Sequence, residues 1–266
     1  MLEVTLIARP QLVLPRDMIE AASENQIKGT DAECLVEVAG RICYDSLGKG
    51  RGSEAYHAHI LEVGHGSVEE HAQFSFRIRG VSRALTHELV RHRVGVAISQ
   101  RSTRYVDESE AYVVRHPAAA ALSDATVAEA ERAIRSARFA YQLIADDVEA
   151  GLLANGVDKA TARKQARGAA RLILPNGIET ELIWSANIRT LRHVVEMRAD
   201  DAADAEIRAL GIALLGIMQV EAPAYFKGYE VVEAADGIGL VVRKDAPRTP
   251  KVVRVTADGP WTPVKK

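Results

Sequence analysis

Basic side chains concentrate in one stretch of the chain, residues 77–104. It holds seven arginines and a single acidic residue, Glu88. Within it, the segment RHRVGVAISQRSTRY (91–105) places an Arg-His-Arg triplet before a loop of small residues, followed by Ser102 and Arg104. A lone basic triplet is usually a solvated surface patch. Arginine beside hydroxyl groups is typical of a phosphate site, because the guanidinium fork binds phosphate through two hydrogen bonds. The stretch therefore predicts a small anionic ligand.

A second polar group lies in the segment ARLILPNGIETELIWSANIRTLRHVVEMR (170–198), which contains Arg171. On a helix that starts near Asn187, the side chains of Asn187 and Arg198 share one face, and those of Arg189 and His193 share another. A charged, solvated helix would explain any one of these residues. Two polar faces on one helix favour a helix that lies between binding sites.

A histidine-rich segment, HAHILEVGHGSVEEH (57–71), raises the question of a metal site, because imidazole and carboxylate groups are common metal ligands. It contains no HExxH spacing. Two histidines separated by two positions would point ~200° apart on a helix. We therefore expect no metal site. The residues concerned are His57, His59, His65, His71, Glu69 and Glu70.

The composition limits the class of protein. The chain has 266 residues, 47% of them hydrophobic, which is enough for a sizeable core. Its net charge of -2 argues against a nucleic-acid-binding protein. Two cysteines, Cys34 and Cys43, form neither a disulfide framework nor a zinc motif, and are expected to pack on a helix. No signal peptide or membrane span is recognisable, which indicates a cytoplasmic protein without a membrane partner.

Hydrophobic periodicity predicts elements that alternate irregularly between helix and strand, which favours an α+β fold. The chain contains no GxGxxG or GxxxxGK[ST] loop, so a Rossmann or P-loop nucleotide site is not expected. A helix from Ser82 through Arg91 would place Arg83, His87 and Arg91 on one face. The predicted strands are 2–8, 71–80 and 179–186. The predicted helices are 31–45 with Asp31 as the cap, 53–63, 82–93 with Ser82 as the cap, 124–154 with Ser123 or Asp124 as the cap, a helix from Asp158, 187–198, and 204–222.

The expected organisation is one catalytic domain, residues 1–228, followed by a C-terminal extension, residues 229–266. The extension has four prolines between 244 and 266 and little periodicity, which is typical of a tail that is ordered only in part.

These motifs together resemble the flavin-dependent thymidylate synthase family. The family pattern is the Arg-His-Arg triplet followed, after seven residues, by Ser-x-Arg-Tyr. Here Ser102-Thr103-Arg104-Tyr105 follows the triplet after eight residues, one more than in the family. The resemblance extends back through GHGSVEEHAQFSF and GVSRALTHELVRHR, and forward to ARLILPNGIETELIWSANIRTLRHVVEMRADDAADAEIR. It covers roughly residues 60–210 in several blocks. Two further departures are Arg101, where the family often has an apolar residue, and HVVEMR, which lacks the usual aromatic residue.

The resemblance implies FAD as the cofactor, NADPH and methylenetetrahydrofolate as co-substrates, and dUMP as the substrate. It also implies a homotetramer whose long central helices form the subunit interface, and a distinctive α+β fold. The implied FAD contacts are Ser67, Arg91, His92, Arg93, Gln100, Asn187, Arg189 and His193. The implied dUMP contacts are Glu88, Arg91, Gln100, Arg101, Ser102, Thr103, Arg104, Arg171 and Arg198.

The implied reaction is reductive methylation of dUMP at C5, in which the cofactors carry the difficult steps and the protein orients them. Arg198 is the expected catalytic residue, stabilising negative charge that develops on the pyrimidine. Ser102 has no base next to it in sequence, so we expect it to bind substrate as a hydroxyl and not to act as a nucleophile. Two alternatives remain: a related methylase that acts on UMP in nucleoside-antibiotic biosynthesis, and a non-catalytic anion-binding or nucleotide-binding module.

Overall fold

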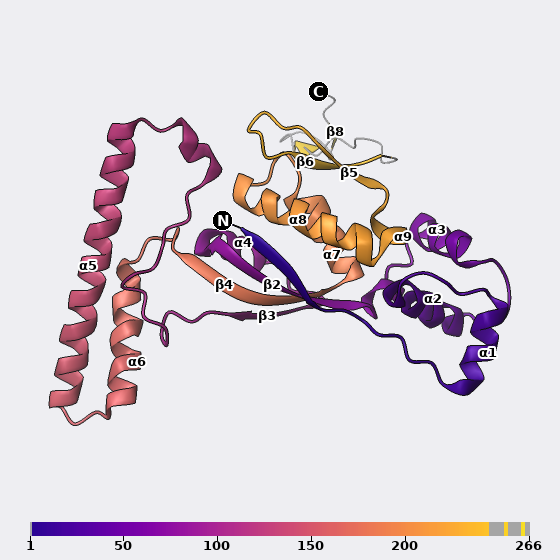
Figure 1. The fold of residues 1–266 in the computed structure, drawn as a ribbon, viewed down its shortest axis with the longest axis horizontal. Coiled ribbons are helices and arrows are strands. Elements are labelled where there is room, and N and C mark those ends of the chain that lie inside the picture. Colours follow the sequence, from indigo (N-terminus) through magenta and orange to yellow (C-terminus); the bar gives the residue numbers. More distant parts are fainter. Residues whose placement is uncertain (1, 245–252, 255–261, 264–266) are drawn as a thin grey trace.

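The fold is mixed α and β, as the sequence predicts (Figure 1). The structure is a computed structural model that describes residues 2–244 and the backbone of two short strands, β7 (Val253–Arg254) and β8 (Thr262–Pro263). Among these residues, none of the helices is long and apolar enough to cross a membrane.

A four-stranded antiparallel sheet lies at the centre, with the strand order β1-β2-β4-β3. All three predicted strands are confirmed. The fourth strand, β3, lies inside the arginine-rich stretch and was not predicted. The strands are β1 (Glu3–Ala8), β2 (Gln73–Ser82), β3 (Val96–Gln100) and β4 (Glu179–Asn187).

Alternation of apolar and polar residues gives this sheet one buried and one exposed face. On β2, Phe74, Phe76 and Ile78 are fully buried, whereas Arg77 and Arg79 are exposed between them. The arginines on the exposed face pair with carboxylates of neighbouring strands, Arg77 with Glu181 and Arg79 with Glu3.

Three helices cover the buried face of the sheet (Figure 1). They are α4 (Arg83–Leu89), α7 (Ile188–Arg198) and α8 (Ala205–Glu221). Their apolar residues form one core with Phe74, Phe76 and Trp184 of the sheet. Because α4 directly follows β2 and α7 directly follows β4, two neighbouring strands deliver the two polar motifs to one region.

The predicted caps are correct at most helix starts. Ser82 accepts a hydrogen bond from the amide of Leu85 and begins α4 as predicted. The helix ends at Leu89, before the predicted end at residue 93, so the condition for a shared face of Arg83, His87 and Arg91 is not met. The Arg-His-Arg triplet follows the helix in a turn.

At one end of the sheet, α2 carries both cysteines in their reduced form. Its cap is Thr30, not Asp31 as predicted, because Thr30 and Glu33 form a reciprocal capping box. The elements at this end are α1 (Arg16–Glu24), α2 (Asp31–Cys43), α3 (Ser53–Val63), the short 3-10 helix η1 (Val68–Glu70) and α9 (Pro223–Phe226).

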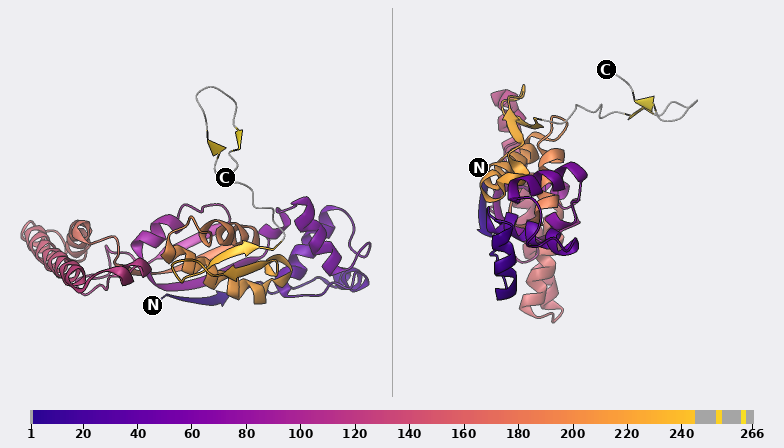
Figure 2. Two further views of the ribbon diagram at one scale, coloured as in Figure 1. Left: turned by 90° about the horizontal axis from the view of Figure 1, so that it is seen from above. Right: turned by 90° about the vertical axis from the view of Figure 1, so that its right-hand side faces the viewer.

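At the opposite end, two antiparallel helices form an arm that projects from the sheet (Figure 2). They are α5 (Asp124–Ala154), capped by Ser123, and α6 (Lys159–Ala170), capped by Asp158, both as predicted. The 3-10 helices η2 (Pro117–Ala121) and η3 (Arg171–Ile173) join the arm to the rest of the chain. Tyr141 is the one buried residue along the whole of α5.

The chain after Gly228 begins with a hairpin that the sequence did not predict. Its strands are β5 (Tyr229–Val232) and β6 (Leu240–Arg243). Tyr229 and Val241 are buried in the same core as the residues that precede them. Most of the expected extension beyond Lys244 lies outside the described residues.

Candidate functional site

Arg198, at the end of α7, contacts the Arg-His-Arg motif from 106 residues away in sequence. Its Nε donates to Nε2 of His92 at 2.8 Å, and its Nη1 donates to a carboxylate oxygen of Glu88 at 2.8 Å. The His193 ring lies edge-on to His92, with ring centroids 5.3 Å apart. We call Glu88, His92, His193 and Arg198 the Arg198 cluster.

The Arg198 cluster holds His92 in its neutral form. Burial, with the adjacent Arg198 guanidinium, lowers the pKa of His92 to about 4. An arginine Nε can only donate a hydrogen bond, so Nε2 of His92 carries the lone pair. The neutral ring therefore carries its proton on Nδ1. The cluster thus presents a fixed guanidinium and an imidazole with a defined donor.

Asn187 caps the start of α7 and packs tightly against the turn that follows the triplet. Its side-chain oxygen accepts from the amide of Thr190, and Thr190 Oγ1 donates to the carbonyl of Val94. Gly95 has φ +69°, and a Cβ there would lie 2.3 Å from Asn187 Nδ2. Only glycine fits this turn, so the turn places the triplet against the first residues of α7.

Arg189, two residues after Asn187 in the first turn of α7, reaches back to η1. Its Nη1 donates to Glu70 at 2.5 Å, and a Cβ at Gly66 would lie 3.1 Å from its Nε. Ser67 is exposed beside Gly66. This brings two of the residues assigned to FAD, Ser67 and Arg189, to one surface.

Arg91 and Arg93 differ from Arg198 because they are exposed and unpaired. Among the residues that the structure describes, neither side chain forms a hydrogen bond or ion pair. Two exposed, unpaired guanidinium groups are suited to an anionic group.

A second set of predicted residues lies beyond the other end of α4. Arg171 Nη1 donates to the hydroxyl of buried Thr103 at 3.4 Å. Ser102 accepts from the backbone amide of Arg104, which leaves the Arg104 side chain exposed to solvent. No histidine or carboxylate contacts the Ser102 hydroxyl within the part of the chain that is described, so the serine has no base partner there.

Arg101 is turned toward the protein. It donates to the carbonyl of Glu179 at 2.8 Å and lies 3.4 Å from the Glu108 carboxylate, whose pKa is raised by burial. This predicted substrate contact holds the loop in place, and its guanidinium is already partnered.

Gln100 lies between the two sets. Its side chain donates to Thr86 on α4 and Thr180 on β4, at 3.1 and 3.2 Å. Arg83 starts α4 near Arg101, and Glu88 ends it in the Arg198 cluster. Seven residues of helix span about 10 Å, comparable with an extended nucleoside monophosphate. The polar residues therefore form a track along α4.

The histidine-rich segment does not assemble a metal site. His57 is buried and bonded to Tyr225, and burial lowers the pKa of His57 to about 4. His65 stacks on exposed Tyr44, and His59 lies near Glu62. Among the described residues, no group of three or more His, Cys, Asp or Glu could hold a metal ion.

Sequence reasoning missed several residues that support this region. Thr86 and Thr180 fix Gln100, and Arg192 forms a buried ion pair with Glu69 at 2.7 Å that joins α7 to η1. Burial raises the pKa of Glu69, and Arg192 opposes that shift. These pairs are up to 123 residues apart in sequence. The only local signal was the position of Arg192 on the helix, between the buried residues Leu191 and Val195.

The chain matches known proteins along most of its length. Residues 26–224 match the family model described as thymidylate synthase complementing protein. The flavin-dependent thymidylate synthase of Mycobacterium sp. (strain JLS) is 43% identical over 246 residues, which cover 89% of this chain and 93% of that protein. The enzymes of that name from Mycobacteroides abscessus and Mycobacterium bovis are 40% and 42% identical, over 91% and 89% of this chain and 95% and 93% of theirs.

The antiparallel sheet and the helices packed on it define an α+β protein, and arginines line a track along α4. The family match and the identities to these relatives show that the chain belongs to the thymidylate synthase complementing protein family.

Proposed function

We propose that the protein is a flavin-dependent thymidylate synthase with the fold of that family. It converts dUMP to dTMP by reductive methylation at C5, with methylenetetrahydrofolate as the carbon donor and NADPH as the reductant. The observation that carries the proposal is the contact of Arg198 with His92 and Glu88, which joins the two motifs of the family in one cluster. Family membership and the names of the relatives support the same reaction.

The residues near α7 fit FAD. The unpaired cations Arg91 and Arg93 suit its anionic pyrophosphate, and His92 offers a neutral Nδ1–H donor. Bound FAD would supply hydride transfer, which no protein side chain supplies. The residues that would hold it are Ser67, Arg91, His92, Arg93, Gln100, Asn187, Arg189 and His193.

The track along α4 fits dUMP. Arg198 would stabilise negative charge on the pyrimidine, since a fixed guanidinium in a partly buried site acts strongly on developing charge. Thr103 and Arg171 would hold the phosphate at the far end. The complete set proposed to contact dUMP is Glu88, Arg91, Gln100, Arg101, Ser102, Thr103, Arg104, Arg171 and Arg198.

Neither cysteine is suited to attack the pyrimidine. Burial, with the nearby Glu37 carboxylate, raises the pKa of Cys34 to about 11, so its thiol is protonated at neutral pH. Cys43 lies on the same helix, α2, outside the arginine-rich track. This supports a reaction in which cofactors, not a thiolate, activate the carbon transfer.

The α5–α6 arm supports a homotetramer in which the long helices pack between subunits. Phe139 and Leu143, four residues apart on α5, are 67% and 49% exposed, and Leu172 beside the arm is 85% exposed. Apolar residues at this spacing share one helix face and need a partner surface. Light scattering coupled to size-exclusion chromatography would measure the assembly, and a monomer at micromolar concentration would contradict it.

The function is tested by the absorbance spectrum of the purified protein and by product formation. We expect a yellow protein with noncovalent FAD that makes dTMP from dUMP only when methylenetetrahydrofolate and NADPH are both present. Omitting each co-substrate in turn is the control. A colourless protein that takes up no added FAD would overturn the enzyme assignment and leave an anion-binding module.

A further inference from the structure

A basic pocket lies between α6 and the turn that follows Ser102. It has a volume of about 340 Å³. No acidic residue lines it, and its polar lining consists of Arg104, Tyr105, Thr161, Arg163, Lys164 and Arg167. We call it the Arg104 pocket.

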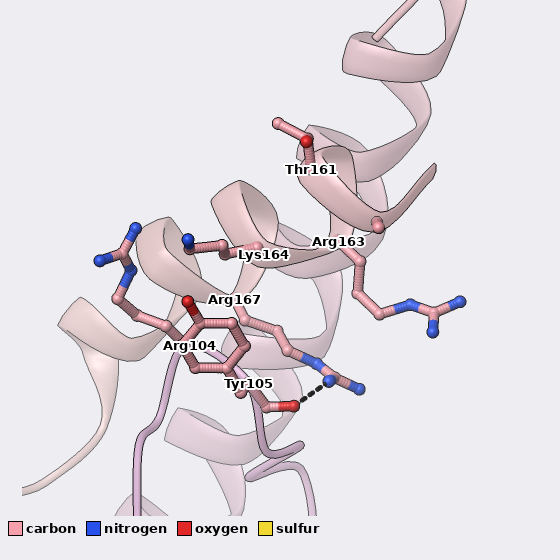
Figure 3. Close-up of a pocket in the computed structure, with 7 residues that line it drawn as sticks. Arg104, Tyr105, Thr161, Arg163, Lys164 and Arg167 are labelled. Atoms are coloured by element: carbon pink, nitrogen blue, oxygen red, sulfur yellow. Dashed lines mark hydrogen bonds between the residues drawn. The ribbon is translucent and has the colours of Figure 1, made fainter. Parts of the chain in front are cut away.

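The cations of the Arg104 pocket divide into two kinds. Arg167 is committed to the protein, since it donates to the Tyr105 carbonyl at 2.6 Å and to Asp107 at 3.1 Å. Arg163 lies 3.8 Å from Glu149 and points away from Arg104 and Lys164 (Figure 3). Arg104 and Lys164 have no carboxylate partner among the described residues.

Three groups converge on one side of the pocket. Figure 3 shows the Arg104 guanidinium, the Lys164 ammonium and the Tyr105 hydroxyl pointing the same way. Lys164 lies 5.0 Å from the centre of the Tyr105 ring, and its hydrogen bond to the hydroxyl lowers the pKa of Tyr105. Lys164 can only donate, so the Tyr105 O–H remains free to donate outward.

This arrangement costs electrostatic energy in the absence of an anion, because two cations extend to the same side of the pocket and no acidic residue lines it. An arginine fork, an ammonium and a hydroxyl together provide donors in several directions. A planar carboxylate has two oxygens that can accept hydrogen bonds from these donors. A phosphate monoester has three such oxygens and carries more negative charge.

The Arg104 pocket is separate from its neighbour on the other side of the same turn. The neighbouring pocket is lined by Arg83, Thr103 and Arg171, and none of these lines the Arg104 pocket. The chain thus has two adjacent basic pockets, with Thr103 facing one and Arg104 facing the other.

We propose that Arg104, Tyr105 and Lys164 form a binding site for a phosphate monoester dianion, with Lys164 as a specificity-determining residue. The inference rests on the proposed function, because two of the substrates of that reaction carry such a group. They are dUMP, with its 5′-phosphate, and NADPH, with its 2′-phosphate.

The test uses Lys164→Gln in the full-length, FAD-loaded enzyme, with KM measured for dUMP, NADPH and NADH. Loss of one charged hydrogen bond predicts a rise of about tenfold or more in one KM and little change in kcat. NADH lacks the 2′-phosphate and separates the two sources. A rise for NADPH but not NADH identifies the 2′-phosphate, and a rise for dUMP alone identifies the 5′-phosphate.

Lys159→Gln is the matched control, since Lys159 starts the same helix and does not line the pocket. Tyr105→Phe removes the hydroxyl and keeps the ring, so it tests the same site if Lys164→Gln lowers the melting temperature. Calorimetric titration with inorganic phosphate and with dUMP gives a readout without turnover. If all three KM values and both binding constants of the variants match the control, the site is refuted. An inactive wild type would instead refute the proposed function itself.

Discussion

The Arg198 cluster and the Arg104 pocket are both cationic, but they differ in what their cations contact. Arg198 donates to Glu88 and His92 and is 22% exposed, so its position is fixed before any ligand arrives. Arg104 and Lys164 have no acidic partner in the described part of the chain and lie at the surface. A fixed cation suits charge that develops during a reaction, since it needs no reorganisation at that moment. Unpaired cations suit the capture of a charged ligand from solution.

The largest effect that separates the two regions is expected at Arg198. Arg198→Ala should reduce kcat by about a thousandfold or more while leaving the flavin content nearly unchanged, because the loss falls on the transition state. Single-turnover methylation with FAD-loaded protein measures it. Arg198→Lys keeps the charge and loses the planar guanidinium. Its kcat should lie between those of the wild type and of Arg198→Ala. Near-normal turnover of the alanine variant would remove the catalytic role of Arg198.

The choice between dUMP and UMP tests the track that joins the two regions. The extra residue between Arg93 and Ser102 is accommodated without disturbing the sheet, because β3 pairs with β4 in unbroken register. We expect dUMP to be preferred, by no more than about a hundredfold, since a site rejects an added hydroxyl only moderately. Competition between the two nucleotides gives the ratio of kcat/KM. A higher value for UMP would reassign the protein to the antibiotic-type methylase.

A smaller effect is expected at Ser102, which lies between the two regions. Its hydroxyl accepts from the Arg104 amide and contacts no base within the described residues, which is consistent with a binding role. Ser102→Ala should weaken dUMP binding by about tenfold and reduce, but not abolish, dTMP formation. Ser99→Ala, on the neighbouring strand, is a suitable control. Complete loss of turnover with dUMP and FAD still bound, or a covalent adduct trapped on Ser102, would show a nucleophile instead.

Local signals in the sequence predict much of the fold. Ser82, Ser123 and Asp158 each cap a helix where a short polar residue precedes an apolar repeat. The β5–β6 hairpin was missed because its strands have four residues each, too few for alternation to be recognised, and its stability depends on burial of Tyr229 and Val241 against distant helices.

The site was only partly predictable, for a related physical reason. The sequence motifs identify the candidate site residues, but the pairing of β2 with β4 is what brings Arg198 to His92. Lys164 had no signal, since it reaches Tyr105 only after α6 folds back along α5. Sequence therefore identified residue types that bind anions, whereas tertiary packing decided which of them are paired.

The smallest expected effect is a dependence on pH that belongs to the Arg198 cluster alone. In the folded protein the pKa of His92 is lowered to about 4 by burial and by Arg198, whereas an unfolded histidine titrates near ~6.5. As pH falls through that interval the unfolded state takes up the proton first, so the free energy of unfolding decreases, and below the folded pKa this contribution stops changing. His92→Gln keeps an acceptor for Arg198 and removes the titration. Its unfolding free energy should therefore fall less steeply as the pH decreases across this interval. Urea denaturation across that range measures the slope, and Lys164→Gln, in a pocket without histidine, should keep the wild-type slope. If the unfolding free energy of wild type and of His92→Gln depended equally on pH, His92 would not be held neutral. The ion pair with Glu88 would then be the one contact that distinguishes Arg198 from the cations of the Arg104 pocket.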